Sequence, residues 1–199
     1  MDGISKMSYP ECGSLIELAA AAKRDTDKQW LHGYLHAYET LFSTYRDTDG
    51  VVMELGVYKG DSLRLWRDWF CRAQIVGLDI STTYFFTEPR VRTFLCDCGD
   101  GAKLAALMAA ENMRPVIIMD DASHDPVHQA AAFNALFPFL RPGGMYVIED
   151  WTGDKLPLMT ELAGRHAQDI LWWAPVDLSL SGMYLAYGDS RLAVYVRKH

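Results

Sequence analysis

The sequence predicts a doubly wound α/β fold built on a mostly parallel sheet. From residue 51 onward, short apolar runs alternate with segments whose apolar residues recur at helical spacing, the pattern of strands separated by covering helices. The chain has 199 residues, 50% of them hydrophobic, which is enough for one core of ordinary size. We therefore expect a single domain over residues 1–199.

The predicted elements follow one another in a regular order. Strands are predicted over 51–56, 74–80, 91–97, 115–121 and 145–150. Helices are predicted over 61–70, 101–113 and 124–140, with a weaker helical segment after Asp79. The runs 182–188 and 191–199 flank turn residues 188–190, which predicts an antiparallel C-terminal hairpin at the sheet edge. Residues 1–50 are predicted to be a helical extension, either a lid or simple packing, before the core of 51–199.

Composition narrows the possible partners and the compartment. The formal net charge is −7 and no Lys/Arg block is present, which argues against nucleic acid or an anionic membrane surface as a partner. No run approaches the ~20 apolar residues of a membrane span, and the N-terminus lacks the pattern of a signal peptide. We expect a cytoplasmic protein with reduced cysteines whose partner is a small molecule.

Every predicted strand of the parallel sheet ends in an acidic residue. These residues are Glu54, Asp79, Asp97, the pair Asp120 and Asp121, and the pair Glu149 and Asp150. Ligands of such sheets bind outside the carboxyl ends of the strands. Acids at all five ends therefore predict a functional rim rather than solvated strand ends.

The first half of this rim suits a nucleoside. Gly56 and Gly60 lie on the turn after the first strand, with Asp61 or Ser62 able to cap the next helix. This G-x-x-x-G spacing is a weak signal by itself, and it differs from the dinucleotide pattern G-x-G-x-x-G. Asp79 lies at the ~20-residue separation at which an acid accepts ribose hydroxyls. With Asp97 facing an adenine amino group, the set fits an adenosine.

The second half of the rim suits a metal ion and a base. Asp121, Glu149 and Asp150 should converge at the ends of two strands, and three carboxylates without a cation would repel one another. Mg²⁺, a hard cation that prefers oxygen ligands, would remove this conflict. His124 is three residues after Asp121 and is suited to be a general base. His128 is expected to be a packing residue.

The motifs ELGVYKG, GLDI, CDCGD and LRPGGMYVIED, taken in order, resemble those of class I S-adenosylmethionine-dependent methyltransferases. The resemblance implies a Rossmann-like methyltransferase fold. It also implies that Gly56 and Gly60 lie beside the methionine part of the cofactor, Asp79 on the ribose and Asp97 near adenine. The implied cofactor-binding residues are Glu54, Gly56, Tyr58, Gly60, Ser62, Asp79, Ile80, Asp97 and Asp120.

DDASH, IED and the N-terminal TDKQWLHGYLHAYETLF resemble a narrower group. This group contains the metal-dependent antibiotic-sugar O-methyltransferases of the mycinamicin and macrocin type and the cephalosporin hydroxylase-like proteins. It implies Mg²⁺-assisted methyl transfer to a hydroxyl of a small, sugar-like or natural-product acceptor. Asp121, Glu149 and Asp150 would hold the metal and His124 would be the catalytic base. We also expect a homo-oligomer.

Two other functions are compatible with parts of the sequence. An Fe(II)-dependent hydroxylase could use Asp121, His124 and His128 as a two-histidine, one-carboxylate triad, which would leave the glycine turn, Asp79 and Asp97 unexplained. A non-catalytic binding module could keep the S-adenosylmethionine fold without turnover. The intact DDASH and IED segments argue against this, because a carboxylate cluster without a metal is destabilising.

Overall fold

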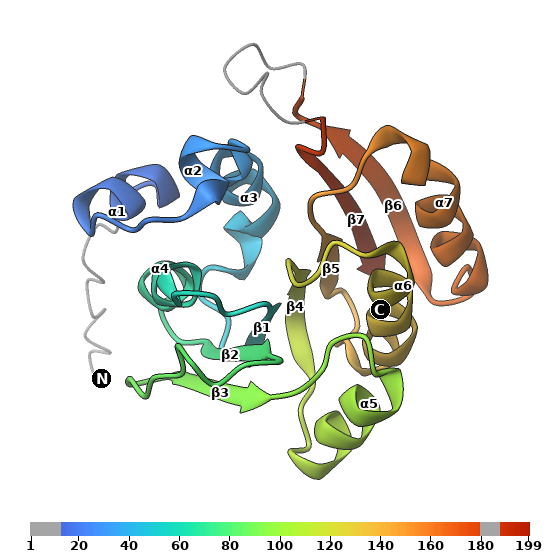
Figure 1. Ribbon diagram of the computed structural model, residues 1–199, viewed down its shortest axis with the longest axis horizontal. Coiled ribbons are helices and arrows are strands. Elements are labelled where there is room, and N and C mark those ends of the chain that lie inside the picture. Colours follow the sequence, from blue (N-terminus) through green and yellow to red (C-terminus); the bar gives the residue numbers. More distant parts are fainter. Residues whose placement is uncertain (1–12, 180–187) are drawn as a thin grey trace, which may run out of the picture.

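The computed structural model describes residues 13–179 and 188–199, and within them one mixed sheet forms the centre of the molecule (Figure 1). Its strand order is β3-β2-β1-β4-β5-β7-β6. The strands are β1 (Val51–Leu55), β2 (Gln74–Asp79), β3 (Val91–Leu95), β4 (Pro115–Asp120), β5 (Met145–Ile148), β6 (Ile170–Asp177) and β7 (Arg191–Arg197). The first five pair in parallel, while β7 pairs antiparallel with both β5 and β6. The predicted fold class is confirmed.

Helices cover both faces of this sheet. They are α1 (Leu15–Ala21), α2 (Asp27–Trp30), α3 (Tyr34–Phe42), α4 (Asp61–Trp69), α5 (Gly101–Ala110), α6 (Pro126–Leu136) and α7 (Leu156–Arg165), with 3₁₀ turns at Ser43–Tyr45, Phe137–Phe139 and Gly153–Lys155. Figure 1 shows α1 to α4 on one side of the sheet and α5 to α7 on the other. No helix in the described parts of the chain is long and apolar enough to span a membrane.

Successive strand residues point to opposite sides, so each strand contributes to two apolar cores. Val52 of β1 and Ile117 of β4 belong to the core beneath α1, α3 and α4. Their neighbours Met53 and Ile118 belong to the core beneath α5, α6 and α7. Because both faces are buried, the parallel strands read as continuous apolar runs in the sequence.

The C-terminal part of the fold differs in detail from the prediction. β7 is confirmed, but within the described residues it lies between β5 and β6. The sequence analysis did not identify β6, and it also missed α7. Pro175 interrupts the run that forms β6, and proline is tolerated there because β6 is an edge strand. The predicted strand at 182–188 lies outside the described residues, except for Gly188.

The turn between β1 and α4 approaches β4 closely. Gly56 has φ of +93°, and a Cβ atom built on it would lie 2.2 Å from the backbone oxygen of Asp121. Glycine is required at Gly56 for both reasons, since other residues rarely adopt this φ and no side chain fits. The close approach brings the glycine turn against the segment that follows β4.

We predict that Gly56→Ala lowers the free energy of unfolding by at least about 1–3 kcal/mol, the usual cost of a strained backbone conformation. Gly164→Ala is the matched control, because Gly164 is in α7 and a Cβ there meets nothing within 4 Å. Alanine at Gly164 should be neutral or stabilising by up to about 1 kcal/mol. Urea unfolding of both variants measures this, and equal stabilities would contradict the prediction.

Candidate active site

The carboxyl ends of β1, β2 and β4 face a cavity of about 610 Å³. It is lined by the glycine turn, by α2 and the residues before it, and by the segment that follows β4. A second cavity of about 270 Å³ lies beside it and shares Gly56, Asp79 and Ala122 with the first. The ends of β1, β2 and β4 therefore lie between the two cavities.

The predicted cofactor-binding residues fall into two sets. Seven line the cavities: Gly56, Tyr58, Gly60, Ser62 and Asp79 in the larger, and Gly56, Asp79, Ile80 and Asp97 in the smaller. Glu54 and Asp120 lie beneath the cavities, with exposed fractions of only 1% and 2%. These two carboxylates are buried and line neither cavity.

Asp79 organises the glycine turn. One of its carboxylate oxygens accepts hydrogen bonds from the backbone N–H of Val57 at 2.8 Å and of Tyr58 at 3.3 Å. The other oxygen accepts from the N–H of Ser81 at 2.8 Å. The end of β2 thus fixes the turn after β1, at the boundary of the two cavities.

Glu54 is held from α4. Its Oε2 accepts from the Ser62 hydroxyl at 2.7 Å and from the Trp66 indole N–H at 3.2 Å. Burial raises the pKa of Glu54 to about 7, and the positive charge of Lys28 opposes this rise. Burial likewise raises the pKa of Asp120 to about 7, and the Tyr146 hydroxyl donates to that carboxylate at 3.4 Å.

His128 lines the smaller cavity with Asp97, where the sequence analysis expected only a packing residue. Its Nδ1 lies 3.0 Å from the Ser123 hydroxyl. The ring packs on the loop at Gly99, where a Cβ would come within 2.7 Å of it. His128 is thus absent from both groups of potential metal ligands in the described residues. The geometry gives no support to a triad of Asp121, His124 and His128.

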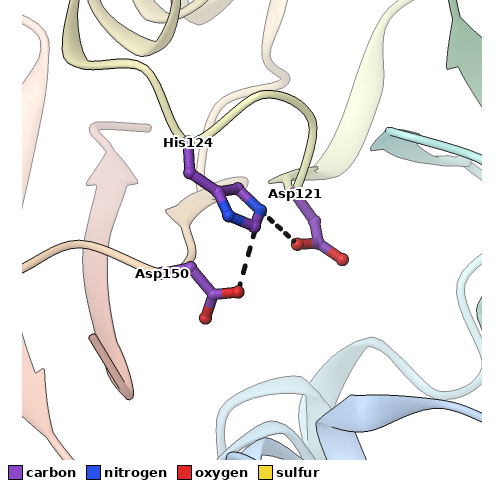
Figure 2. A group of neighbouring side chains, drawn as sticks. All are labelled: Asp121, His124 and Asp150. Carbon is purple, nitrogen blue, oxygen red and sulfur yellow. Dashed lines mark hydrogen bonds and ion pairs between the residues drawn. The ribbon is translucent and has the colours of Figure 1, made fainter. Parts of the chain in front are cut away.

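The side chains of Asp121, His124 and Asp150 converge, and the first two line the larger cavity (Figure 2). His124 Nε2 lies 3.1 Å from Asp121 Oδ1 and 3.7 Å from Asp150 Oδ2. The potential ligand atoms of the three side chains all lie within 4.8 Å of one another. We call these three residues the outer group. They combine the predicted base with two of the three predicted metal ligands.

The backbone of the outer group is unusual. His124 has φ of +55° and Asp150 has φ of +54°, values that are uncommon for residues other than glycine. Lys155 donates from Nζ to the backbone oxygen of His124 at 2.8 Å, and the Tyr34 hydroxyl donates to Asp150 Oδ1 at 2.5 Å. Such left-handed conformations cluster at functional sites, where surrounding contacts hold them in place.

The third predicted metal ligand, Glu149, is hydrogen-bonded to Lys28 and Tyr38. Its carboxylate accepts from Lys28 Nζ at 2.8 and 2.9 Å and from the Tyr38 hydroxyl at 2.6 Å. Lys28 also contacts Asp121 Oδ2 and lies 3.5 Å from Glu54 Oε1. We call Glu54, Asp121 and Glu149 the inner group. Its cation is a lysine from the N-terminal TDK motif, to which the sequence analysis assigned no role.

Charge and burial shift the pKa values of the groups in this cluster in different directions. Burial acts to lower the pKa of Lys28, but the nearby carboxylates raise it overall, so the lysine stays charged. Burial and the charge of Asp121 raise the pKa of both Glu149 and Asp150. Asp121 is buried, yet Lys28 and His124 lower its pKa. The hydrogen bond to Asp121 raises the pKa of His124.

The donors of the outer group suit a hard divalent cation. Two carboxylates and an imidazole converge beside a cavity that Asp121 and His124 line, and Mg²⁺ is commonly held by one or two carboxylates with water filling the other positions. Because Mg²⁺ prefers oxygen, Asp121 and Asp150 fit as ligands and His124 is left as a base. The residues present therefore fit the metal.

The known proteins that the chain resembles in sequence are O-methyltransferases. No family model matches the chain. It is 41% identical over 138 residues to the 8-demethyl-8-alpha-L-rhamnosyl tetracenomycin-C 2'-O-methyltransferase of Streptomyces olivaceus, covering 65% of this chain and 36% of that protein. It is 42% identical over 132 residues to the mycinamicin VI 2''-O-methyltransferase of Micromonospora griseorubida, covering 62% of this chain and 33% of that protein. The chain thus spans only about a third of the length of these relatives.

The fold has solved counterparts. MycE methyltransferase from the mycinamycin biosynthetic pathway, in complex with Mg and SAH, superimposes with a TM-score of 0.75 and 29% sequence identity. The match covers 94% of this chain and 55% of that protein. The predicted resemblance is confirmed: the chain is a homologue of the antibiotic-sugar O-methyltransferases and shares the fold of the mycinamycin-pathway enzyme.

Proposed function

We propose that the chain is an S-adenosylmethionine-dependent, Mg²⁺-assisted O-methyltransferase whose acceptor is a hydroxyl of a small sugar-like or natural-product molecule. The observation that carries this proposal is the joint position of two features. The cavity that is lined by the glycine turn and Asp79 is also lined by Asp121 and His124 of the outer group. The names of the relatives, which are sugar O-methyltransferases, and the Mg and SAH of the MycE complexes support it.

Different residues of the chain would bind the cofactor and hold the metal. Gly56, Gly60 and Asp79 would bind the cofactor in the larger cavity, with Asp97 in the smaller. S-adenosylmethionine would supply an electrophilic methyl group, and Mg²⁺ held by Asp121 and Asp150 would orient the acceptor hydroxyl and lower its pKa. Glu149 stays a predicted ligand, although both its oxygens are bonded to protein groups here.

His124 would accept the hydroxyl proton at Nε2. Its hydrogen bond to Asp121 orients the ring toward the cluster, and neutral imidazole is the form that can accept a proton. Alignment of acceptor oxygen and methyl group within the cavity would supply much of the remaining acceleration. That the chain assembles as a homo-oligomer stays a prediction, which light scattering would test.

The direct test incubates the protein with labelled S-adenosylmethionine, Mg²⁺ and a panel of glycosylated polyketides, followed by mass spectrometry. We expect label on one sugar hydroxyl, and no label in excess chelator. A protein that bound NAD but neither S-adenosylmethionine nor its demethylated product would overturn the proposal. Full activity in chelator would overturn the metal's role.

Asp79→Ala should weaken binding of SAH by about 1–3 kcal/mol, because it removes a charged acceptor from the cavity and the anchor of the glycine turn. Binding should not need added metal. Asp169→Ala is the control, since Asp169 is exposed and lines neither cavity. Calorimetry measures both, and equal affinities would count against the cofactor site.

Binding of Mg²⁺ should release protons. Burial and the charge of Asp121 raise the pKa of Glu149 and Asp150, so these groups keep their protons to higher pH than free carboxyl groups do. The cation needs the ionised forms, so its apparent affinity should rise with pH and then level off. Calorimetry in buffers of different ionisation enthalpy tests this. Heats that are independent of the buffer would contradict it.

His124→Ala should lose about 10²–10⁴-fold in turnover, the usual contribution of a general base, and keep its affinity for SAH. The acidic limb of the pH profile, where protonated His124 cannot accept a proton, should disappear with it. His128→Ala should stay within about tenfold in turnover, an effect of about 1.4 kcal/mol or less. The reverse pattern would show that the base is misassigned.

A further inference from the structure

Lys28 is a fully buried lysine at the junction of three strands. It belongs to α2, and its side chain is 1% exposed. Its Nζ contacts the carboxylates of the inner group, which come from β1 and from the residues that follow β4 and β5. A buried ammonium with three acidic neighbours is a specific arrangement, because removing its charge would leave uncompensated carboxylates.

The inner group has the spacing of a cation site. One oxygen each from Glu54, Asp121 and Glu149 lies within 4.8 Å of the others. Glu54 Oε1 is buried and accepts no hydrogen bond from the described residues, while it faces Lys28 Nζ at 3.5 Å. The lysine ammonium thus occupies the position that a metal ion would take among these oxygens.

Asp121 links the inner and outer groups. Its Oδ2 contacts Lys28, and its Oδ1 lies 3.1 Å from His124 Nε2. The lysine therefore orients the Asp121 carboxylate, with one oxygen toward Lys28 and the other toward His124. Without Lys28, the carboxylates of Asp121 and Glu149 could turn to bind one divalent cation or two.

We propose that Lys28 is the resident cation of the inner group: it fills a second divalent-cation site and positions Asp121 to serve the outer group. This inference rests on the proposed function only for the identity of the outer site. The proposal gives Lys28 a role in metal binding, which packing of the N-terminal helices alone would not require. A purely structural lysine would stabilise the fold and leave metal binding unchanged.

The test measures Mn²⁺ bound per chain at about pH 8, well above the ordinary pKa range of free carboxyl groups. We expect Lys28→Met to bind one more Mn²⁺ than the wild type. The melting temperature of this variant should be lowered without metal and restored by Mg²⁺ far more than the wild type is stabilised. Lys59→Met is the matched control, because it removes the same charge from the rim of the same cavity, where Lys59 is exposed and lies 3.4 Å from Asp25.

Lys28→Gln repeats the test with a polar neutral side chain if the methionine variant fails to fold without metal. An unchanged Mn²⁺ count together with a melting temperature that Mg²⁺ does not rescue would overturn the proposal, as would failure of both variants to fold at any Mg²⁺ concentration. The quantity compared is the number of Mn²⁺ ions bound per chain by the variant and by the wild type. A wild type without Mn²⁺ beside a variant with one would support the role of Lys28 and refute the outer metal site.

Discussion

The compensation of buried negative charge is the constraint on which this site depends. Parallel strands bring their carboxyl ends to one edge, and here that edge collects Glu54, Asp121 and Glu149 beneath the surface. Burial of carboxylates without a cation costs several kcal/mol per ion. Lys28 meets that requirement, and its own charge is sustained by the acids that it neutralises. Neither partner would be stable in this position alone.

This compensation also explains the arrangement of the N-terminal helices. α2 carries Lys28 to the inner group, and α3 carries Tyr34 and Tyr38, whose hydroxyls donate to Asp150 and Glu149. Burial raises the pKa of both tyrosines, so they remain protonated donors. The segment that precedes the sheet therefore supplies the charge and hydrogen bonds that the strand ends lack, and it lines the larger cavity.

The asymmetry between the inner and outer groups suits catalysis. Glu54 and Glu149 of the inner group are only 1% exposed and face Lys28, while the outer group contains a partly exposed His124 that lines the larger cavity. Asp121 belongs to both groups, so the buried ion pairs fix the geometry of the open half. A fixed first set of ligands is what positions a reacting hydroxyl, because small displacements are costly in rate.

The sequence by itself determined the parallel strands, the glycine turn and the identities of the acids at the strand ends, because alternating elements and strand-end residues follow from local pattern. It also indicated that Asp121, His124 and Asp150 share one site, since adjacent parallel strands end together. Only the tertiary structure decided that Lys28 reaches Asp121 and Glu149, across separations of 93 and 121 residues. It likewise decided that Glu149 turns inward and His128 lines the second cavity. Side-chain direction and contacts between distant segments depend on packing, which no local pattern encodes.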